Sequence, residues 1–208
     1  RRRDVLAQPE TLRHVAGQGD LETSLGQLRY RVSATAFFQP NTLAAARLYE
    51  TIRELADLSG AERVWDLYCG AGGIGLYLAA GLTSLRVVGF ETNAEAVANA
   101  EANARLNGVA NAVFRAGRVE TRLRDEAEAP DVIVTDPPRS GMSAETVDAI
   151  LSRMPARIVS VSCDPATQAR DVGRLLGAYA PVAARPVDLF PHTPHVENVI
   201  LLRRRLDV

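Results

Sequence analysis

From residue 61 onward, short apolar runs alternate with longer segments in which apolar residues recur every three or four positions. The short runs are rich in β-branched residues and predict strands, whereas the longer segments predict amphipathic helices. We predict strands at 63–68, 85–90, 112–116, 132–135, 157–162, 182–189 and 199–203. We predict helices at 74–80, 94–106, 143–154 and 166–176, and an exposed charged turn before residue 132.

Alternating strands and helices with short connections predict an α/β fold, a mostly parallel sheet covered by helices on both faces. Ligands bind such sheets at the carboxyl ends of the strands. Before this unit, residues 21–25 and 27–33 predict a β-hairpin around Gly26, and residues 41–58 predict a helix. We therefore expect a β-rich segment over 1–40, the remnant of an upstream region, followed by the α/β domain over 41–208. The start at Arg1 is consistent with a piece of a longer protein.

The composition fits a globular chain with one main core, because 47% of the 208 residues are hydrophobic and 24% are charged. A net charge of −1 gives no overall basic signature of nucleic-acid binding, so such binding would need local patches. The two cysteines and the lack of a long apolar run favour a reducing compartment, the cytoplasm, and no membrane span.

A glycine-rich turn with the pattern G-x-G-x-x-G joins the first strand of the α/β unit to a helix, with glycines at Gly70, Gly72 and Gly75. Glycines let the backbone approach a ligand closely, and the helix amino terminus faces that ligand. Glu91 ends the next strand, where a carboxylate can accept hydrogen bonds from ribose hydroxyls. This pattern predicts a nucleoside-containing cofactor, and we assign Cys69 in the turn a structural role.

Cys163 follows a buried strand and precedes Asp164 and Pro165, which are residues that open helices. A helix amino terminus lowers the pKa of a nearby thiol and raises its thiolate fraction. Cys163 is therefore a candidate nucleophile. The alternative is a small buried residue at the end of a strand.

Two carboxylates and two histidines occupy other ends of predicted strands. Asp136 ends a strand before two prolines, where it either orients a polar ligand or forms a turn. Glu197 begins an apolar strand, so burial should raise its pKa toward a value useful for a general base. His14 is the only other histidine, so we predict no metal site at His192 and His195. We expect these two histidines to hydrogen-bond to the backbone or to line a substrate entrance.

Five sequence motifs, taken together and in this order, resemble a known family. They are FFQPN at 37–41, DLYCGAGGIG at 66–75, TDPPRSG at 135–141, SCDP at 162–165 and FPHTPHVE at 190–197. The chain resembles, over about 35–202, the catalytic domain of the S-adenosylmethionine-dependent RNA uracil-C5 methyltransferases. The compact final motif is closer to the ribosomal-RNA members than to the tRNA members.

The resemblance implies a class I methyltransferase (Rossmann-like) fold with a seven-stranded sheet. It implies Cys163 as the nucleophile and Glu197 as the proton acceptor. It implies cofactor contacts at Gln39, Tyr68, Glu91 and Asp136, and the glycine pattern adds Gly70 and Gly72. Some members carry Asn at the position of Gly73, where this chain has no side chain to make a contact. Two cysteines cannot hold the iron–sulfur cluster that many members carry upstream.

The expected function is methyl transfer from S-adenosylmethionine to carbon 5 of a uridine, through a cysteine–C6 adduct. S-adenosylhomocysteine is the other product. The expected partner is RNA, with rRNA favoured over tRNA, and the enzyme is expected to be a monomer without a membrane partner. Three alternatives stay open: a tRNA-specific member, an amino-group methyltransferase acting on a purine base, and a non-catalytic RNA-binding or cofactor-binding module. A nicotinamide dehydrogenase shares the glycine pattern, but nothing in the sequence offers hydride chemistry.

Overall fold

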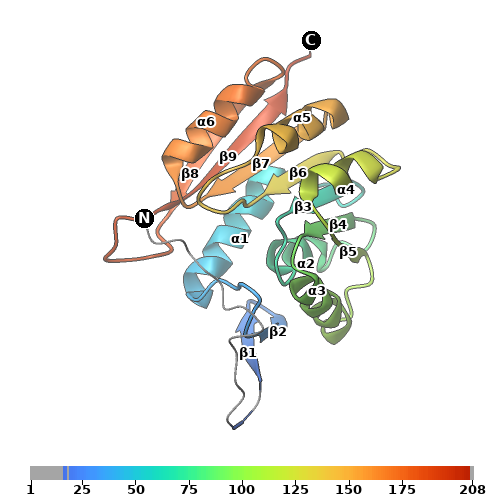
Figure 1. Ribbon diagram of the computed structural model, residues 1–208, viewed down its shortest axis with the longest axis vertical. Coiled ribbons are helices and arrows are strands. Elements are labelled where there is room, and N and C mark those ends of the chain that lie inside the picture. Colours follow the sequence, from blue (N-terminus) through green and yellow to red (C-terminus); the bar gives the residue numbers. More distant parts are fainter. Residues whose placement is uncertain (1–15, 18, 207–208) are drawn as a thin grey trace.

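The computed structural model describes residues 16–17 and 19–206, and within them it contains a seven-stranded sheet, six helices and a separate hairpin (Figure 1). The strand order of the sheet is β5-β4-β3-β6-β7-β9-β8. Neighbours among the first five strands are parallel, whereas β9 is antiparallel to both β7 and β8. The predicted mostly parallel α/β sheet is therefore confirmed. His14 lies outside the described residues.

The strands of the large sheet are β3 (Arg63–Leu67), β4 (Arg86–Glu91), β5 (Ala112–Ala116), β6 (Val132–Thr135), β7 (Arg157–Ser162), β8 (Tyr179–Val187) and β9 (Glu197–Arg204). The helices are α1 (Thr42–Ala56), α2 (Gly73–Ala79), α3 (Ala94–Leu106), α4 (Val119–Asp125), α5 (Ala144–Arg153) and α6 (Pro165–Leu175). These bounds confirm most predicted elements to within one or two residues.

Helices cover both faces of the sheet, because successive side chains of its strands point to opposite sides. Val64 packs on one side with the buried faces of α1, α2 and α3, whereas Trp65 packs on the other with those of α4, α5 and α6. The prediction missed α4, whose residues we expected to form an exposed charged turn. Val119 and Leu123, four positions apart, are buried and fix this short helix against the sheet.

The last two strands also differ from the prediction, since β8 begins three residues earlier and β9 is longer at its start. Each strand extends because its partner extends: Tyr179 pairs with Arg204, and Val187 pairs with Glu197. Pro186 and an irregularity after Pro181 fit an edge strand, which tolerates missing ladder hydrogen bonds.

The predicted hairpin is confirmed as β1 (Asp20–Leu25) and β2 (Leu28–Ser33), paired antiparallel. Gly26 adopts a φ of 60° in the turn, a backbone conformation that glycine reaches without steric cost. Tyr30 and Val32 are buried in the same core cluster as α1, α2 and α3. The hairpin therefore packs against the α/β unit, and the expected domain division at residue 40 stays a prediction.

Four parallel strands bring chemically capable residues to one edge of the sheet. Tyr68 follows β3, Glu91 ends β4, Asp136 follows β6 and Cys163 follows β7. Because β9 runs antiparallel to β7 and pairs Asn198 with Ser162, its first residue lies at the same edge.

No helix among the described residues is long and apolar enough to cross a membrane.

Candidate active site

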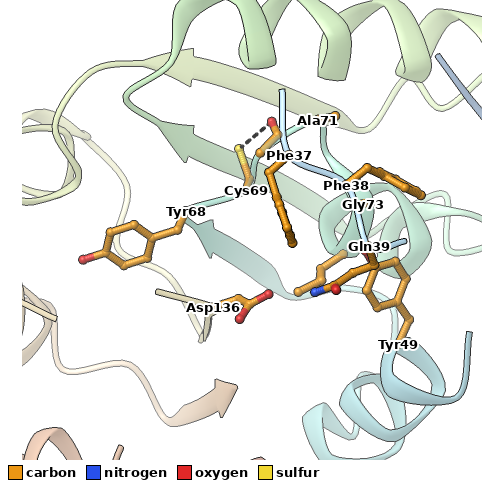
Figure 2. A pocket seen from close by; sticks show the side chains of 11 residues that line it. Phe37, Phe38, Gln39, Tyr49, Tyr68, Cys69, Ala71, Gly73 and Asp136 are labelled. Carbon is orange, nitrogen blue, oxygen red and sulfur yellow. Dashed lines mark hydrogen bonds between the residues drawn. The ribbon is translucent and has the colours of Figure 1, made fainter. Parts of the chain in front are cut away.

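A narrow cavity lies at this edge of the sheet, between the segment before α1, the glycine-rich turn and Asp136 (Figure 2). Gln39 and Asp136 point into the same space from opposite sides, and the ring of Phe37 lies between them. Phe37 is 52% exposed. An exposed aromatic ring beside two polar groups suits a planar, polar ligand.

Gln39 is the polar group most clearly prepared for a ligand. Its side chain is only 6% exposed, yet its Oε1 atom has no hydrogen-bond partner within the described protein. The following residues fix its position: the Asn41 side chain accepts a hydrogen bond from the Ala44 amide (3.1 Å) and donates one to the Leu189 carbonyl (3.1 Å). A buried acceptor without a partner is costly, and a ligand donor at Oε1 would remove that cost.

The glycine-rich turn has an unusual backbone, since Tyr68, Gly70 and Gly72 all adopt positive φ values of 64°, 52° and 83°. For Tyr68 this conformation is strained, and its hydroxyl is held by the Thr146 side chain at 3.3 Å. A β-carbon at Gly73 would collide with the Tyr49 hydroxyl. The asparagine that some family members carry at position 73 would therefore not fit here without movement of Tyr49.

Glu91 and Gly72 do not line the cavity themselves. The Glu91 carboxylate accepts hydrogen bonds from the amides of Gly70 (3.2 Å) and Asn93 (2.8 Å) and from the Thr92 hydroxyl (3.0 Å). A β-carbon at Gly72 would press on neighbouring side chains at 3.0 Å, so glycine there permits close packing. Both residues shape the turn, and their cofactor contacts stay predictions.

Cys163 lies half-buried beside three charged groups, and its thiol hydrogen-bonds to the side chain of Arg139. Burial raises the pKa of Cys163, and so do the negative charges of Glu197 and Asp136, while Arg139 acts in the opposite direction. The predicted lowering of the thiol pKa is therefore wrong for this state of the protein.

The amino terminus of α6 does not offset these effects, because its donors are bound by other groups. The Ser162 hydroxyl accepts a hydrogen bond from the Asp164 amide at 3.1 Å. The Asp164 carboxylate in turn accepts from the amides of Ala166 (2.9 Å) and Thr167 (3.0 Å). These helix donors are already paired with other groups, so the sequence pattern that placed the thiol near them did not give it their stabilising hydrogen bonds.

Both carboxylates next to the thiol hold protons more tightly than usual. Burial, together with the charge of Asp136, raises the pKa of Glu197 to about 7, although Arg139 acts against this shift. Burial raises the pKa of Asp136 to about 6. Glu197 is only 3% exposed and its Oε2 atom has no hydrogen-bond partner within the described protein. The predicted upward shift of the Glu197 pKa is confirmed, and this carboxylate can both take up and release a proton near neutral pH.

Sequence reasoning missed two residues that support this arrangement. Arg139 was not singled out, although it follows Asp136 in the same loop and interacts with Cys163 and Glu197. Asp171 on α6 is buried and accepts a hydrogen bond from the Met142 amide at 2.7 Å, which ties the loop after β6 to the helix after Cys163. An aspartate on the apolar face of a predicted helix was the available signal.

The histidines lie in the loop before β9. His192 is exposed with a φ of 66°, and the ring of His195 packs edge-on against Phe190 with ring centres 6.5 Å apart. Within the described ranges, no three potential ligands gather that could hold a metal ion. Neither histidine is among the residues that line the cavity, and their expected place at a substrate entrance stays a prediction.

The seven-stranded sheet and the ligand cavity at its edge define a class I methyltransferase fold. Among solved structures, a Pyrococcus abyssi tRNA (uracil-54, C5)-methyltransferase in complex with S-adenosyl-L-homocysteine matches at a TM-score of 0.79 and 34% identity, over 90% of this chain and 45% of that one. TrmN from Thermus thermophilus matches at a TM-score of 0.64 and 21% identity, over 78% of this chain and 52% of that one, which supports the fold alone.

The family follows from the sequence match. The model of the tRNA (uracil-5-)-methyltransferase family matches residues 17–205, so the chain belongs to that family. An uncharacterized RNA methyltransferase of Nitratidesulfovibrio vulgaris is 47% identical, over 91% of this chain and 41% of the relative. One from Porphyromonas gingivalis is 43% identical, over 98% and 44% respectively. The chain thus spans less than half the length of these curated relatives.

Proposed function

We propose that this chain is the catalytic part of an RNA methyltransferase that transfers a methyl group from S-adenosylmethionine to carbon 5 of uridine. One observation carries the proposal: the thiol of Cys163 and the carboxylates of Asp136 and Glu197 interact at one edge of the sheet. They lie beside a cavity into which Gln39 and Asp136 point. This set of groups suits addition to a pyrimidine ring followed by proton removal.

The cavity residues fit the cofactor that the family uses. We propose that Gln39, Tyr68, Gly70, Gly72, Glu91 and Asp136 form the site for S-adenosylmethionine. The unpaired oxygen of Gln39, which lines the cavity beside the turn, supports a polar ligand lying against it. When bound, the cofactor supplies an electrophilic methyl group on a sulfonium sulfur. A related structure holds the demethylated product of the same cofactor.

Cys163 is the proposed nucleophile because carbon 5 of uracil is a poor nucleophile until carbon 6 is saturated. A bond forms between the Cys163 sulfur and carbon 6, and the electron pair displaced from the 5,6 double bond makes the ring an enolate. Carbon 5 then forms its bond to the methyl carbon as the carbon–sulfur bond of the sulfonium breaks. Arg139, which hydrogen-bonds to the thiol, favours the thiolate that this addition needs.

Glu197 is the proposed base that completes the reaction. It removes the proton left on carbon 5, and the electron pair of that carbon–hydrogen bond restores the double bond while the Cys163 thiolate leaves carbon 6. The net change is one methyl group gained and one proton released. A carboxylate with a pKa of about 7 and an unpaired oxygen is suited to this step near neutral pH.

The RNA class is a finer proposal. The final motif favours rRNA, whereas the printed descriptions of the family and of the solved relative concern tRNA. In either RNA the target base must leave its stack for carbon 6 to reach Cys163, so we propose a loop or a flipped nucleotide as the target. The cytoplasm and a monomeric state complete the proposal.

The test uses rRNA and tRNA transcripts made with 5-fluorouridine, incubated with the chain and methyl-labelled S-adenosylmethionine. Because fluorine at carbon 5 cannot leave as a proton does, the reaction stops at the covalent adduct. We expect a labelled protein–RNA band that survives denaturation with one of the two RNA classes and is absent for Cys163→Ala. Methyl transfer to ordinary RNA without any adduct on the fluorinated RNA would contradict the proposal and favour an amino-group methyltransferase.

A further inference from the structure

Three asparagines, two on α3 and one at its C-cap, face the free edge of strand β2, and we call them the asparagine ladder. Each binds one residue of the strand, and the residues bound are every second one. The ladder consists of Asn99, Asn103 and Asn107, which bind Ser33, Arg31 and Arg29 respectively. Four helical residues rise about 6 Å, and two strand residues rise about 6.6 Å, so the two spacings match. The side-chain amides therefore take the place of a neighbouring strand.

The pairing resembles that of backbone peptide groups. Asn107 accepts from the Arg29 amide (2.9 Å) and donates to the Arg29 carbonyl (2.7 Å). Asn103 repeats the pattern with Arg31, at 2.7 Å and 3.1 Å. Asn99 accepts from the Ser33 amide at 3.1 Å and donates to its hydroxyl at 2.9 Å. The ladder thus closes the edge of β2 with a helix.

Asn103 differs from the other two because it also reaches the cavity. Its Nδ2 donates a further hydrogen bond to the Ala71 carbonyl at 3.2 Å, and Ala71 lines the cavity in the glycine-rich turn. The corresponding further bonds of Asn107 and Asn99 stay within α3, at the carbonyls of Asn103 and Glu95. Asn103 is fully buried, whereas Asn99 and Asn107 are half-buried.

The hairpin reaches the cavity through a second residue, Tyr30. Its hydroxyl donates to the Gly73 carbonyl at 3.2 Å, and its ring packs on Phe38 with ring centres 4.8 Å apart. Gly73 and Phe38 both line the cavity, one from the glycine-rich turn and one from the segment that carries Gln39. A single hairpin residue therefore contacts both of these lining segments.

We infer that the β1–β2 hairpin helps to form the cofactor site. Asn103 and Tyr30 are positioning residues that hold the glycine-rich turn against the hairpin. The inference rests on the proposed function, since it takes the cavity as the site for S-adenosylmethionine. Two carbonyls of the turn, those of Ala71 and Gly73, are bound by these side chains. Fixing them sets the direction of the neighbouring peptide groups, which a ligand lying on the turn would contact.

The experiment compares Asn103→Ala with Asn107→Ala. Both variants lose a pair of backbone contacts to β2, but only Asn103→Ala frees the turn. We expect the dissociation constant for S-adenosylmethionine, measured by calorimetry, to rise about three- to tenfold for Asn103→Ala, as for the loss of one or two hydrogen bonds. For Asn107→Ala we expect less than about a twofold change, although both variants should unfold at a lower temperature.

Tyr30→Phe provides a milder variant that keeps the ring on Phe38 and removes only the hydroxyl. We expect a rise of about two- to fivefold in the dissociation constant with little change in the unfolding temperature. This variant decides the matter if Asn103→Ala does not fold. Weaker binding in step with lost stability in all variants, Asn107→Ala included, would show a structural role only and overturn the inference.

The same titrations separate this inference from the proposed function. If the wild-type chain binds S-adenosylmethionine and all three variants bind it equally well, the positioning role falls and the proposed function stands. If the wild-type chain does not bind S-adenosylmethionine, the proposed cofactor site falls, and the positioning role falls with it.

Discussion

The edge of the sheet divides into two regions that are built on different principles. The cofactor half comprises the ends of β3 and β4 with the hairpin, and its polar groups are mostly paired, as in the three hydrogen bonds of Asn103 and of Glu91. The reactive half comprises the ends of β6 and β7 and the start of β9. There Asp136, Cys163 and Glu197 all have raised pKa values, and Glu197 has an unpaired buried oxygen.

The difference indicates that one region of the site binds the cofactor and the other carries out the reaction. Paired neutral groups hold a binding surface in one shape at little electrostatic cost. Partly buried titratable groups without hydrogen-bond partners lower the stability of the fold. Because their pKa values lie closer to 7, they can gain and lose a proton near neutral pH. We therefore expect changes at Cys163 and Glu197 to stop chemistry without weakening cofactor binding, and changes in the cofactor half to do the reverse. Asp136 lines the cavity as well, so its loss should affect both.

The largest expected effect is that of Cys163→Ala. Without the thiol no bond to carbon 6 forms, so methyl transfer to RNA should fall by at least about 10³-fold. Cofactor binding should stay within about twofold of wild type, because the proposed cofactor residues lie in other loops. Single-turnover transfer of labelled methyl and calorimetry give the two numbers. Turnover that survives the change would remove Cys163 from the mechanism and end the distinction between the halves.

Glu197→Gln should come next, with a loss of turnover of about 10²- to 10⁴-fold. The thiol can still add and the methyl group can still transfer, but the proton on carbon 5 stays. A methylated covalent adduct should therefore accumulate on ordinary RNA and appear as a shifted band in denaturing gels. In the wild type, turnover should rise with pH through about 7, because the Glu197 carboxylate must be deprotonated to act. Rapid turnover without an adduct would assign the proton to another base.

Arg139→Gln should have a smaller and pH-dependent effect. The guanidinium opposes the upward pKa shifts of both Cys163 and Glu197, so its loss should raise both values further. Turnover at pH 7 should fall by roughly three- to tenfold, and the deficit should shrink as the pH rises and both groups deprotonate. Arg139→Lys should recover part of the activity by keeping the charge.

Arg47→Gln, at an exposed position on α1, is the matched control for Arg139→Gln because it removes the same charge from a residue that does not line the cavity. Its pH–rate profile should follow that of the wild type. An Arg139→Gln profile that is lowered equally at every pH would mean that the arginine contacts RNA rather than tuning the reactive half.

Much of this comparison could be predicted from the sequence, because strand-end positions fix which residues share an edge. The period of apolar residues placed Asp136 and Cys163 at the ends of neighbouring strands. The apolar run after Glu197 correctly indicated its burial and raised pKa. These predictions depend only on periodicity and on the topology of parallel sheets, which local sequence largely determines.

The details that the sequence did not reveal depend on pairing between distant residues. The thiol pKa was predicted in the wrong direction because burial and the charges of Glu197 and Asp136, which come from distant strands, raise it. The α6 amides do not offset this, since Ser162 and Asp164 already bind them. Helix α4 was missed because only two of its seven residues are buried. The contact between Asn103 and Ala71 spans 32 residues, and nothing local to either one indicates it.

Asp66 is a titratable exception within the cofactor half, and it allows the test with the smallest expected effect on turnover. Its side chain is fully buried; one carboxylate oxygen accepts from the Gly75 amide at 2.8 Å, and the other has no partner within the described protein. Burial raises the pKa of Asp66 to about 8, with the charges of Asp136 and Glu91 adding to the shift. Near neutral pH this acid should therefore be protonated, like the neutral groups around it.

Asp66→Asn should accordingly change turnover at pH 7 by less than about twofold, since asparagine mimics the neutral acid. Its effect should appear in the way the free energy of unfolding changes with pH. A folded-state pKa raised above the unfolded value of about 4 stabilises the fold at low pH, and that stabilisation is lost as pH rises through 8. From pH 6 to 9 the wild type should lose about 3 kcal/mol more of its unfolding free energy than the variant. Denaturant titrations at several pH values measure this, with Asp148→Asn, an exposed position on α5, as the charge-matched control. If the unfolding free energies of wild type and Asp66→Asn changed equally with pH, Asp66 would be charged in the folded protein. A buried charge would then support the glycine-rich turn, and the two halves would not differ in the way proposed.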